Sequence, residues 1–133
     1  MESSNQTKIL IVDDDKFLLD MYAIKFKEQG FDTEVAFNGA EALEKIDKGL
    51  MPEICLADVV MPGMNGFELV AEFRKRPSLA AATIVILSNL GQKEDVEKGI
   101  SAGADGYIVK ASATPSEVVK KVLDIVAHKQ PKA

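Results

Sequence analysis

Side chains that can do chemistry follow several short apolar segments of this sequence. They are carboxylates, a hydroxyl and an amine, namely Asp13, Asp14, Asp15, Asp58, Ser88 and Lys110. If the apolar segments are parallel strands, these residues stand at the carboxyl ends of the strands. That edge of an open α/β sheet is where ligands bind. We therefore expect most of these side chains to share one site.

The carboxylates favour a cation in this site. Two carboxylates about 4 Å apart repel each other by about 4 kcal/mol at an effective dielectric constant of roughly 20. Asp13, Asp14 and Asp58 therefore need a cation or a shared proton if they lie together. Oxygen ligands without histidine or cysteine favour a hard cation, and a small site with few protein ligands suits Mg²⁺.

Mg²⁺ in turn suits phosphoryl transfer. Asp58 is the candidate nucleophile, because a carboxylate can accept a phosphoryl group as an aspartyl-phosphate. Lys110 and the metal would neutralise the phosphoryl oxygens, and the Ser88 hydroxyl would donate a hydrogen bond to them. Asp15 has a simpler interpretation as the N-cap of the helix that follows it.

The segments that position these residues alternate between strand and helix. Five apolar runs predict strands at 8–12, 33–36, 53–57, 83–87 and 106–109. Periodic segments after each run predict helices at 16–29, 40–48, 66–75, 93–102 and 114–128. Right-handed crossovers fold this (βα)5 order into a doubly wound, five-stranded parallel sheet with helices on both faces.

Local signals support these elements. The run at 8–12 has no polar alternation, as expected for a strand covered on both faces, whereas the run at 33–36 is more polar and suits a sheet edge. Phe17, Met21 and Ile24 are spaced at i, i+4 and i+7, which predicts a helix. Thr114-Pro-Ser-Glu117 is a capping box with proline at the first helical position, so it opens the last helix.

Length and composition narrow the class of protein. A chain of 133 residues makes one domain, and 21 acidic against 16 basic residues argue against direct nucleic-acid binding. The single cysteine, Cys55, excludes a disulfide framework and suits a small buried hydrophobe. No apolar run approaches the roughly 20 residues that a membrane span needs, and residues 1–7 carry no secretion signal. We expect a cytoplasmic protein that does not bind membranes.

Four motifs in order resemble the receiver domain of two-component response regulators. They are Ile9-Leu-Ile-Val-Asp-Asp-Asp15, Asp58-Val-Val-Met-Pro-Gly-Met-Asn-Gly66, Ile86-Leu-Ser88 and Gly103-Ala-Asp-Gly-Tyr-Ile-Val-Lys110. The resemblance implies a receiver domain at 8–128, between a disordered N-terminal tail at 1–7 and a C-terminal tail at 129–133. It also implies the flavodoxin-like strand order 2-1-3-4-5.

The resemblance assigns a role to each residue of the site. Asp58 is similar to the phosphorylated aspartate, and Lys110 to the lysine that pairs with the phosphate. Mg²⁺ would be bound by Asp14, by Asp58 and by the backbone carbonyl of Val60, with Asp13 acting through water. Ser88 and Tyr107 match the hydroxyl and the aromatic residue of the conformational switch.

The resemblance also implies partners. Receivers take the phosphoryl group from a phosphohistidine on a sensor histidine kinase or a histidine phosphotransfer protein, and regulate a downstream protein effector. Such a protein is no metabolic enzyme and catalyses only its own phosphorylation and autodephosphorylation. The sole histidine, His128, lies at a helix C-terminus and suits a surface position better than a donor role.

Several apolar residues have two interpretations. Phe17, Leu18 and Met21 are candidates for docking the kinase, with core burial as the rival for at least one of them. We expect the fourth helix, which contains Gly99 and has few apolar positions, to be the least firmly packed and the mobile one. The fifth helix carries a wide apolar stripe, which suits core packing, an effector face or a homodimer through the fourth and fifth helices. Its residues are Val118, Val119, Val122, Leu123, Ile125 and Val126.

Two residues depart from the family pattern. Ala111 stands where receivers usually have a proline after the lysine, so we expect either a trans bond with a shifted Lys110 or a strained cis bond. Asn89 follows Ser88 where the family prefers a small residue. These departures favour the alternative of a phosphate-independent interaction module. A Mg²⁺-dependent phosphohydrolase is disfavoured, because Val60 occupies the place of its second acid. Val60 and Leu90 would instead shield the phosphoryl group from water.

Overall fold

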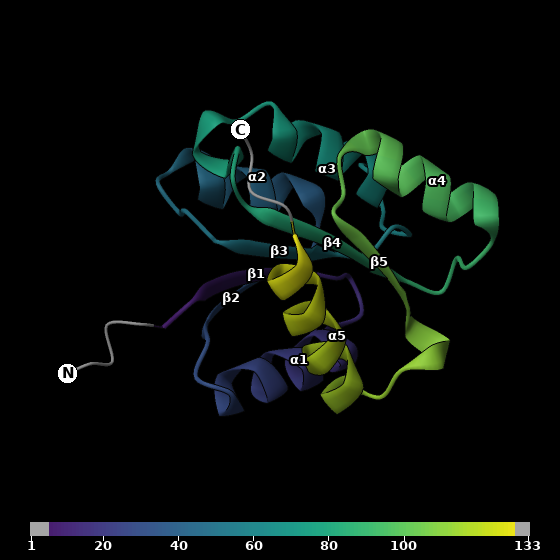
Figure 1. The fold of residues 1–133 in the computed structure, drawn as a ribbon. Helices are drawn as coiled ribbons and strands as arrows, with labels where there is room; N and C mark the ends of the chain where they lie inside the picture. Colours follow the sequence, from purple (N-terminus) through teal and green to yellow (C-terminus); the bar gives the residue numbers. More distant parts are fainter. Residues whose placement is uncertain (1–5, 130–133) are drawn as a thin grey trace.

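The structure is a computed structural model that describes residues 6–129, and strands and helices alternate along it as predicted (Figure 1). The strands are β1 (Lys8–Val12), β2 (Asp32–Ala36), β3 (Ile54–Ala57), β4 (Thr83–Ser88) and β5 (Gly106–Val109). The helices are α1 (Lys16–Glu28), α2 (Gly39–Asp47), α3 (Gly66–Arg74), α4 (Lys93–Ala102) and α5 (Pro115–His128). Short 3₁₀ helices lie at Pro77–Leu79 and Lys110–Ser112.

The five strands form one parallel sheet in the order β2-β1-β3-β4-β5, which confirms the predicted order. The chain runs from β1 outward to β2 and then returns to β3 on the other side of β1. Helices α1 and α5 therefore cover one face of the sheet, and α2, α3 and α4 cover the other (Figure 1). In sheets of this kind, ligands bind at such a reversal, here at the carboxyl ends of β1 and β3.

Two hydrophobic cores, one on each face, explain the strand sequences. Leu10 and Val12 of β1 pack on the side of α2 and α3, whereas Ile9 and Ile11 pack on the side of α1 and α5. Since successive strand residues point to opposite faces, a central strand needs apolar residues at every position. The edge strand β2 is only partly buried before Ala36, as its more polar sequence predicts.

Side-chain caps begin the helices where the sequence predicts them. The Asp15 carboxylate accepts a hydrogen bond from the Leu18 amide at 3.1 Å, which confirms its interpretation as the N-cap of α1. Thr114 and Glu117 form the predicted capping box of α5, with hydrogen bonds of 3.2 and 2.8 Å. These caps satisfy amides that have no partner inside the helix.

Two of the three apolar residues whose spacing predicts α1 lie on the outer side of that helix. Phe17 is 72% exposed and Ile24 is 55% exposed, although the helix itself is where it was predicted. A second set of residues with helical spacing faces the sheet instead, namely Leu19, Tyr22, Ala23 and Phe26. The spacing of apolar residues therefore located the helix but did not select its buried face.

The predicted tails lie mostly outside the described residues, which exclude 1–5 and 130–133. Two tail residues that are described are held by hydrogen bonds. The Thr7 carbonyl accepts from the Asp32 amide at 2.9 Å, and the Lys129 ammonium donates to the Ala82 carbonyl at 2.6 Å. Within residues 6–129, the helices are too short or too polar to cross a membrane.

Candidate functional site

The carboxyl ends of β1 and β3 place two carboxylates side by side. The Asp13 amide donates to the Ala36 carbonyl at 3.1 Å, and the Asp58 amide donates to the Val12 carbonyl at 3.0 Å. Each aspartate therefore continues the sheet hydrogen bonding one residue beyond its strand. Both side chains are nearly buried, with exposures of 2% for Asp13 and 7% for Asp58.

Lys110 reaches across from the end of β5 and contacts both carboxylates. Its Nζ lies 2.8 Å from Asp13 Oδ2 and 3.1 Å from Asp58 Oδ2. The Lys110 side chain is itself only 9% exposed. A cation between two anions in a site that excludes most water makes a strong local interaction, since solvent screens buried charges little.

The pKa values of Asp13 and Lys110 are both raised, which favours the neutral form of the acid and the charged form of the amine. Burial raises the pKa of Asp13, and the hydrogen bond from Lys110 only partly offsets this. Burial alone would lower the pKa of Lys110, but the carboxylates of Asp13 and Asp58 outweigh it and raise that pKa. Lys110 is therefore a fixed positive charge at neutral pH.

The loop after β3 folds back on Asp58. Asp58 Oδ1 accepts from the Val59 amide at 2.7 Å, and the Val59 carbonyl accepts from the Gly66 amide at 2.9 Å. A Cβ atom at position 66 would lie 2.2 Å from the Asp58 carbonyl oxygen, so only glycine fits there. The loop thus fixes one carboxylate oxygen of Asp58, while Lys110 contacts the other.

The same edge of the sheet has the donor set of a hard cation. Carboxylate oxygens of Asp13, Asp14 and Asp58 lie within 4.8 Å of one another, and Asp14 is exposed at the mouth of the group. All three ligands are oxygens, which fits Mg²⁺ better than zinc or copper. The Val60 carbonyl belongs to the loop that carries Asp58, two residues further along the chain.

The backbone of one residue, Leu90, contacts both predicted switch residues. Ser88 ends β4 and is completely buried, and its Oγ accepts from the Leu90 amide at 3.2 Å. The Tyr107 hydroxyl donates to the carbonyl of the same residue, Leu90. Partial burial and the charge of Asp95 raise the pKa of Tyr107.

The Tyr107 ring rests on a notch in α4. A Cβ atom at position 99 would lie 3.1 Å from Tyr107 Cδ2 and 2.7 Å from Ile86 Cδ1, so Gly99 provides the space for the ring. Gly99 is the one buried residue of α4. The sequence shows a glycine inside a helix, but only the packing reveals this role.

The bond after Lys110 is trans, as are the other peptide bonds of residues 6–129. Residues Lys110–Ser112 form a 3₁₀ turn without the family's proline, and the Lys110 amine still reaches both carboxylates. Of the two conformations expected for Ala111, the trans bond is correct and the cis bond is wrong.

Several apolar residues lie close in the sequence to the residues of the site. Phe17 is 72% exposed, Val60 is 62% exposed and Leu90 is partly exposed, whereas Leu18 and Met21 are half-buried. The core therefore does not account for Phe17. Cys55 is fully buried in the core as predicted, and burial raises its pKa to about 12.

Comparison with known proteins identifies the family. Residues 9–123 match the family described as the response regulator receiver domain. The chain belongs to this family. It is 34% identical over 119 residues to the chemotaxis protein CheY of Halobacterium salinarum, covering 90% of this chain and 96% of that protein. The receiver family belongs to two-component signalling and does not favour the phosphate-independent alternative.

Other similar proteins include one of greater length. The chain is 37% identical over 115 residues to the DNA-binding response regulator MtrA of Mycobacterium tuberculosis, covering 86% of this chain but only 48% of MtrA. It thus spans about half the length of this relative. Among solved structures, CheY4 of Vibrio cholerae superposes with a TM-score of 0.84 at 29% identity, covering 91% of this chain and 99% of that one.

Proposed function

We propose that Asp58 accepts a phosphoryl group from a phosphohistidine of a sensor histidine kinase or a histidine phosphotransfer protein. The observation that carries the proposal is the nearly buried Asp58 carboxylate, whose Oδ2 lies 3.1 Å from Lys110 Nζ. A carboxylate oxygen of Asp58 attacks phosphorus, and the phosphorus–nitrogen bond of the donor breaks. The departing imidazole keeps the electron pair and takes a proton from solvent.

The neighbouring residues supply binding and charge. Lys110 would pair with the phosphoryl oxygens, because it already bridges Asp13 and Asp58. Asp14, Asp58 and the Val60 carbonyl would hold Mg²⁺, with Asp13 acting through water. When bound, the metal supplies positive charge that offsets the phosphoryl oxygens. The reaction therefore depends on Mg²⁺.

The phosphoryl group would then act on the switch residues. It adds about −1.5 to −2 charges and three strong acceptor oxygens. We expect the Ser88 hydroxyl to donate to the phosphoryl group, and because its Oγ accepts from the Leu90 amide at 3.2 Å, a movement of Ser88 also moves Leu90. Tyr107 follows, because its hydroxyl is bound to the carbonyl of Leu90. The local charge thereby changes the surface of α4 and β5.

The site would also limit hydrolysis. Val60 and Leu90 are exposed apolar residues on the loops that carry Asp58 and Ser88. They hinder the attacking water and lengthen the lifetime of the aspartyl-phosphate. The protein then catalyses only its own phosphorylation and autodephosphorylation, and it acts as a switch and not as a metabolic enzyme.

Exposed and half-buried apolar side chains suggest where protein partners would bind. The kinase or phosphotransfer protein would dock on Phe17, Leu18 and Met21, beside the acidic group. The effector is a protein that contacts α4, β5 and α5. The exposed residues of the wide α5 stripe lie on other sides of that helix, because Leu123 lines a groove beside α1 and Val126 lies beside the segments before β3 and β4. A homodimer through the α4 and α5 face is the alternative use of the effector surface. Direct nucleic-acid binding is not expected of these residues, given the net charge of −5.

Intact mass tests the proposal. The chain and its Asp58→Asn variant are incubated with a small phosphodonor, with and without Mg²⁺. We expect a Mg²⁺-dependent gain of one phosphoryl group in the unaltered chain and none in the variant. Absence of any gain in a folded sample that still binds Mg²⁺ would contradict it.

A further inference from the structure

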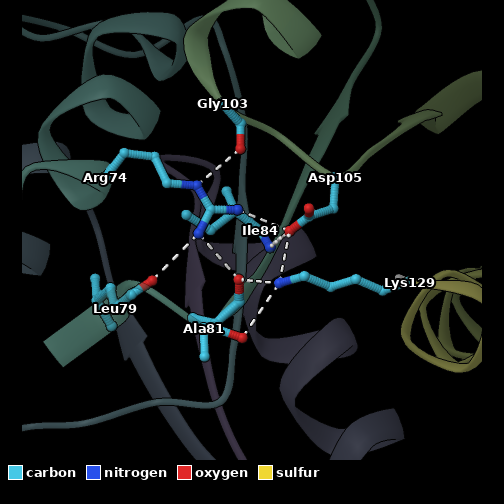
Figure 2. Close-up of polar contacts among 8 residues, drawn as sticks. Arg74, Leu79, Ala81, Ile84, Gly103, Asp105 and Lys129 are labelled. Atoms are coloured by element: carbon cyan, nitrogen blue, oxygen red, sulfur yellow. Dashed lines mark hydrogen bonds and ion pairs between the residues drawn. The ribbon is translucent and has the colours of Figure 1, made fainter. Parts of the chain in front are cut away.

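A second polar cluster lies at the amino ends of β4 and β5, the pole of the sheet opposite Asp58 (Figure 2). Its centre is the Asp105 carboxylate, which directly precedes β5. Asp105 Oδ2 lies 2.8 Å from an Arg74 guanidinium nitrogen and 3.3 Å from Lys129 Nζ, and it also accepts from the Ile84 amide at 2.8 Å. One carboxylate thus holds two cations and one strand amide.

The two cations are themselves tied to backbone carbonyls around the cluster. Arg74 donates from Nε to the Gly103 carbonyl at 2.9 Å, and Lys129 donates to the Ala82 carbonyl at 2.6 Å. The side chains of Arg74 and Asp105 are 18% exposed, and that of Lys129 is 14% exposed. The cluster joins the end of α3, the segments before β4 and β5, and the residue after α5 (Figure 2).

Asp105 fixes how β5 pairs with β4. Its amide donates to the Ile84 carbonyl at 2.7 Å, while its carboxylate accepts from the Ile84 amide. Both polar groups of one β4 residue are therefore bound by one residue. β5 has four residues and, along the described chain, pairs only with β4, so the two bonds of Asp105 to Ile84 are a large share of the backbone contacts that fix its register.

The register of β5 sets where Tyr107 and Lys110 stand at the site. Lys110 lies five residues after Asp105, a distance of roughly 15 Å along an extended chain. Ala111 does not restrict the backbone after Lys110 as a proline would. The position of the Lys110 amine therefore depends on the strand that precedes it.

We propose that Asp105, held by Arg74 and Lys129, is a positioning residue for the phosphoacceptor site. It places Lys110 at the distance from Asp58 that phosphoryl transfer requires. The chemical consequence rests on the proposed function, whereas the effect on the register of β5 does not.

Phosphorylation rates test the positioning role. Asp105→Ala removes all three contacts of the carboxylate, and we expect a fall of about tenfold in the rate with a small phosphodonor, because displacing a charged group by a fraction of an ångström weakens transition-state contacts. Mg²⁺ affinity should not change, since the proposed ligands follow β1 and β3 and, in the part of the chain that the structure describes, make no contact with Asp105. If Asp105→Ala does not fold, Lys129→Met replaces it in the test. This variant keeps the Asp105 carboxylate and removes one of its cations, so we expect a smaller fall in the phosphorylation rate.

Asp47→Asn is the matched control. Asp47 also binds an arginine through both oxygens, at 3.0 and 3.1 Å from Arg76, but it lies at the end of α2 and away from β5. We expect the control to keep the rate of the unaltered chain. Equal losses in Asp47→Asn and Asp105→Ala would overturn the proposal, because they would show a general effect of lost ion pairs.

A double variant separates positioning from lost stability. If Asp105 acts through Lys110, then adding Asp105→Ala to Lys110→Met should change the rate no further. Additive losses would overturn the proposal. Hydrogen exchange at Gly106–Val109 gives a readout without phosphate: we expect faster exchange in Asp105→Ala and unchanged exchange in the control. If the unaltered chain does not take up phosphate, the proposed function is wrong. The effect of Asp105 on the register of β5 is tested separately, because unchanged hydrogen exchange in Asp105→Ala would refute it.

Discussion

At the scale of single residues, the site holds more negative charge than the fold can stabilise alone. Asp13 and Asp58 are both nearly buried, and one lysine amine serves both. Burying charges costs more than an imperfect partner returns. The site therefore suits a further cation, which is the role we propose for Mg²⁺, and an incoming phosphoryl group that Lys110 would bind.

Asp13→Asn should make the protein more stable at neutral pH in the absence of Mg²⁺, by about 1 kcal/mol. Burial raises the pKa of Asp13 above its ordinary value of 3.8, so the fold favours the protonated carboxyl. The stability of the unaltered chain then falls as the pH rises from about 4 through the raised pKa, whereas asparagine does not titrate.

Urea unfolding at about pH 4 and about pH 7 measures this difference. The advantage of Asp13→Asn should be small at the lower pH and larger at the higher one. The prediction is wrong if the stability gain of Asp13→Asn is the same at both pH values, or if the variant is less stable than the unaltered chain at pH 7. Either result would show that burying the charged Asp13 carboxylate does not destabilise the fold.

At the scale of elements, the sequence predicted the strands and helices but not all of their contacts. The unbroken apolar run of β1 and the capping box at Thr114 determine local structure directly, and both were predicted. The exposed side of α1 was not, since Phe17 and Ile24 have the same helical spacing as the residues that face the sheet. A spacing repeats on several faces of a helix, and tertiary packing selects one of them.

Contacts between elements that are distant in the sequence were harder to predict than the elements themselves. Asp13, Asp58 and Lys110 could be predicted to meet because each stands at the end of a strand. Asp105 stands at the beginning of one, and the sequence does not show that Arg74 comes close to it. Gly99 likewise resembles an ordinary helix interruption until the packing places the Tyr107 ring against it.

Gly99→Ala should displace the Tyr107 ring. Alanine favours a helix by about 1 kcal/mol over glycine, so on an open surface this change would stabilise α4. Here the added methyl meets Ile86 and Tyr107, and the partly exposed ring is freer to move than the buried Ile86. We expect little or no gain in stability and a hydroxyl that no longer binds the Leu90 carbonyl.

Fluorotyrosine NMR reports on this change, because the chain has only two tyrosines. The Tyr107 signal should shift toward that of an exposed ring, while the Tyr22 signal stays in place. Ser101→Ala, at an exposed position of the same helix, is the control and should leave both signals unchanged. An unchanged Tyr107 signal in Gly99→Ala would contradict the claim that Gly99 provides the space for the Tyr107 ring.

At the scale of the whole molecule, the two ends of the sheet have different roles. The carboxyl ends carry the acidic group of Asp13, Asp14 and Asp58, and the amino ends carry the cluster around Asp105, in which two cations face one carboxylate. The strands connect the proposed phosphorylation site to this second cluster. β5 carries this connection most directly, since it begins at Asp105 and ends at Lys110.

Mg²⁺ should therefore stabilise the folded chain as a whole. A ligand at about 100 times its dissociation constant adds about 2.7 kcal/mol, which raises the thermal midpoint of a domain of this size by about 10 °C. Scanning calorimetry with and without Mg²⁺ measures the shift. Asp14→Asn should lose most of it, and Asp47→Asn should keep it. Equal shifts in both variants would place the metal elsewhere.

The most direct test of the central claim is to locate the phosphoryl group itself. The chain is treated with a phosphodonor and Mg²⁺, the acyl phosphate is reduced with borohydride, and the peptides are read by tandem mass spectrometry. We predict that homoserine replaces aspartate at position 58 and at no other position. Reduction at Asp13 or Asp14, or no reduction in a chain that has gained a phosphoryl group, would contradict the assignment of Asp58 as the acceptor.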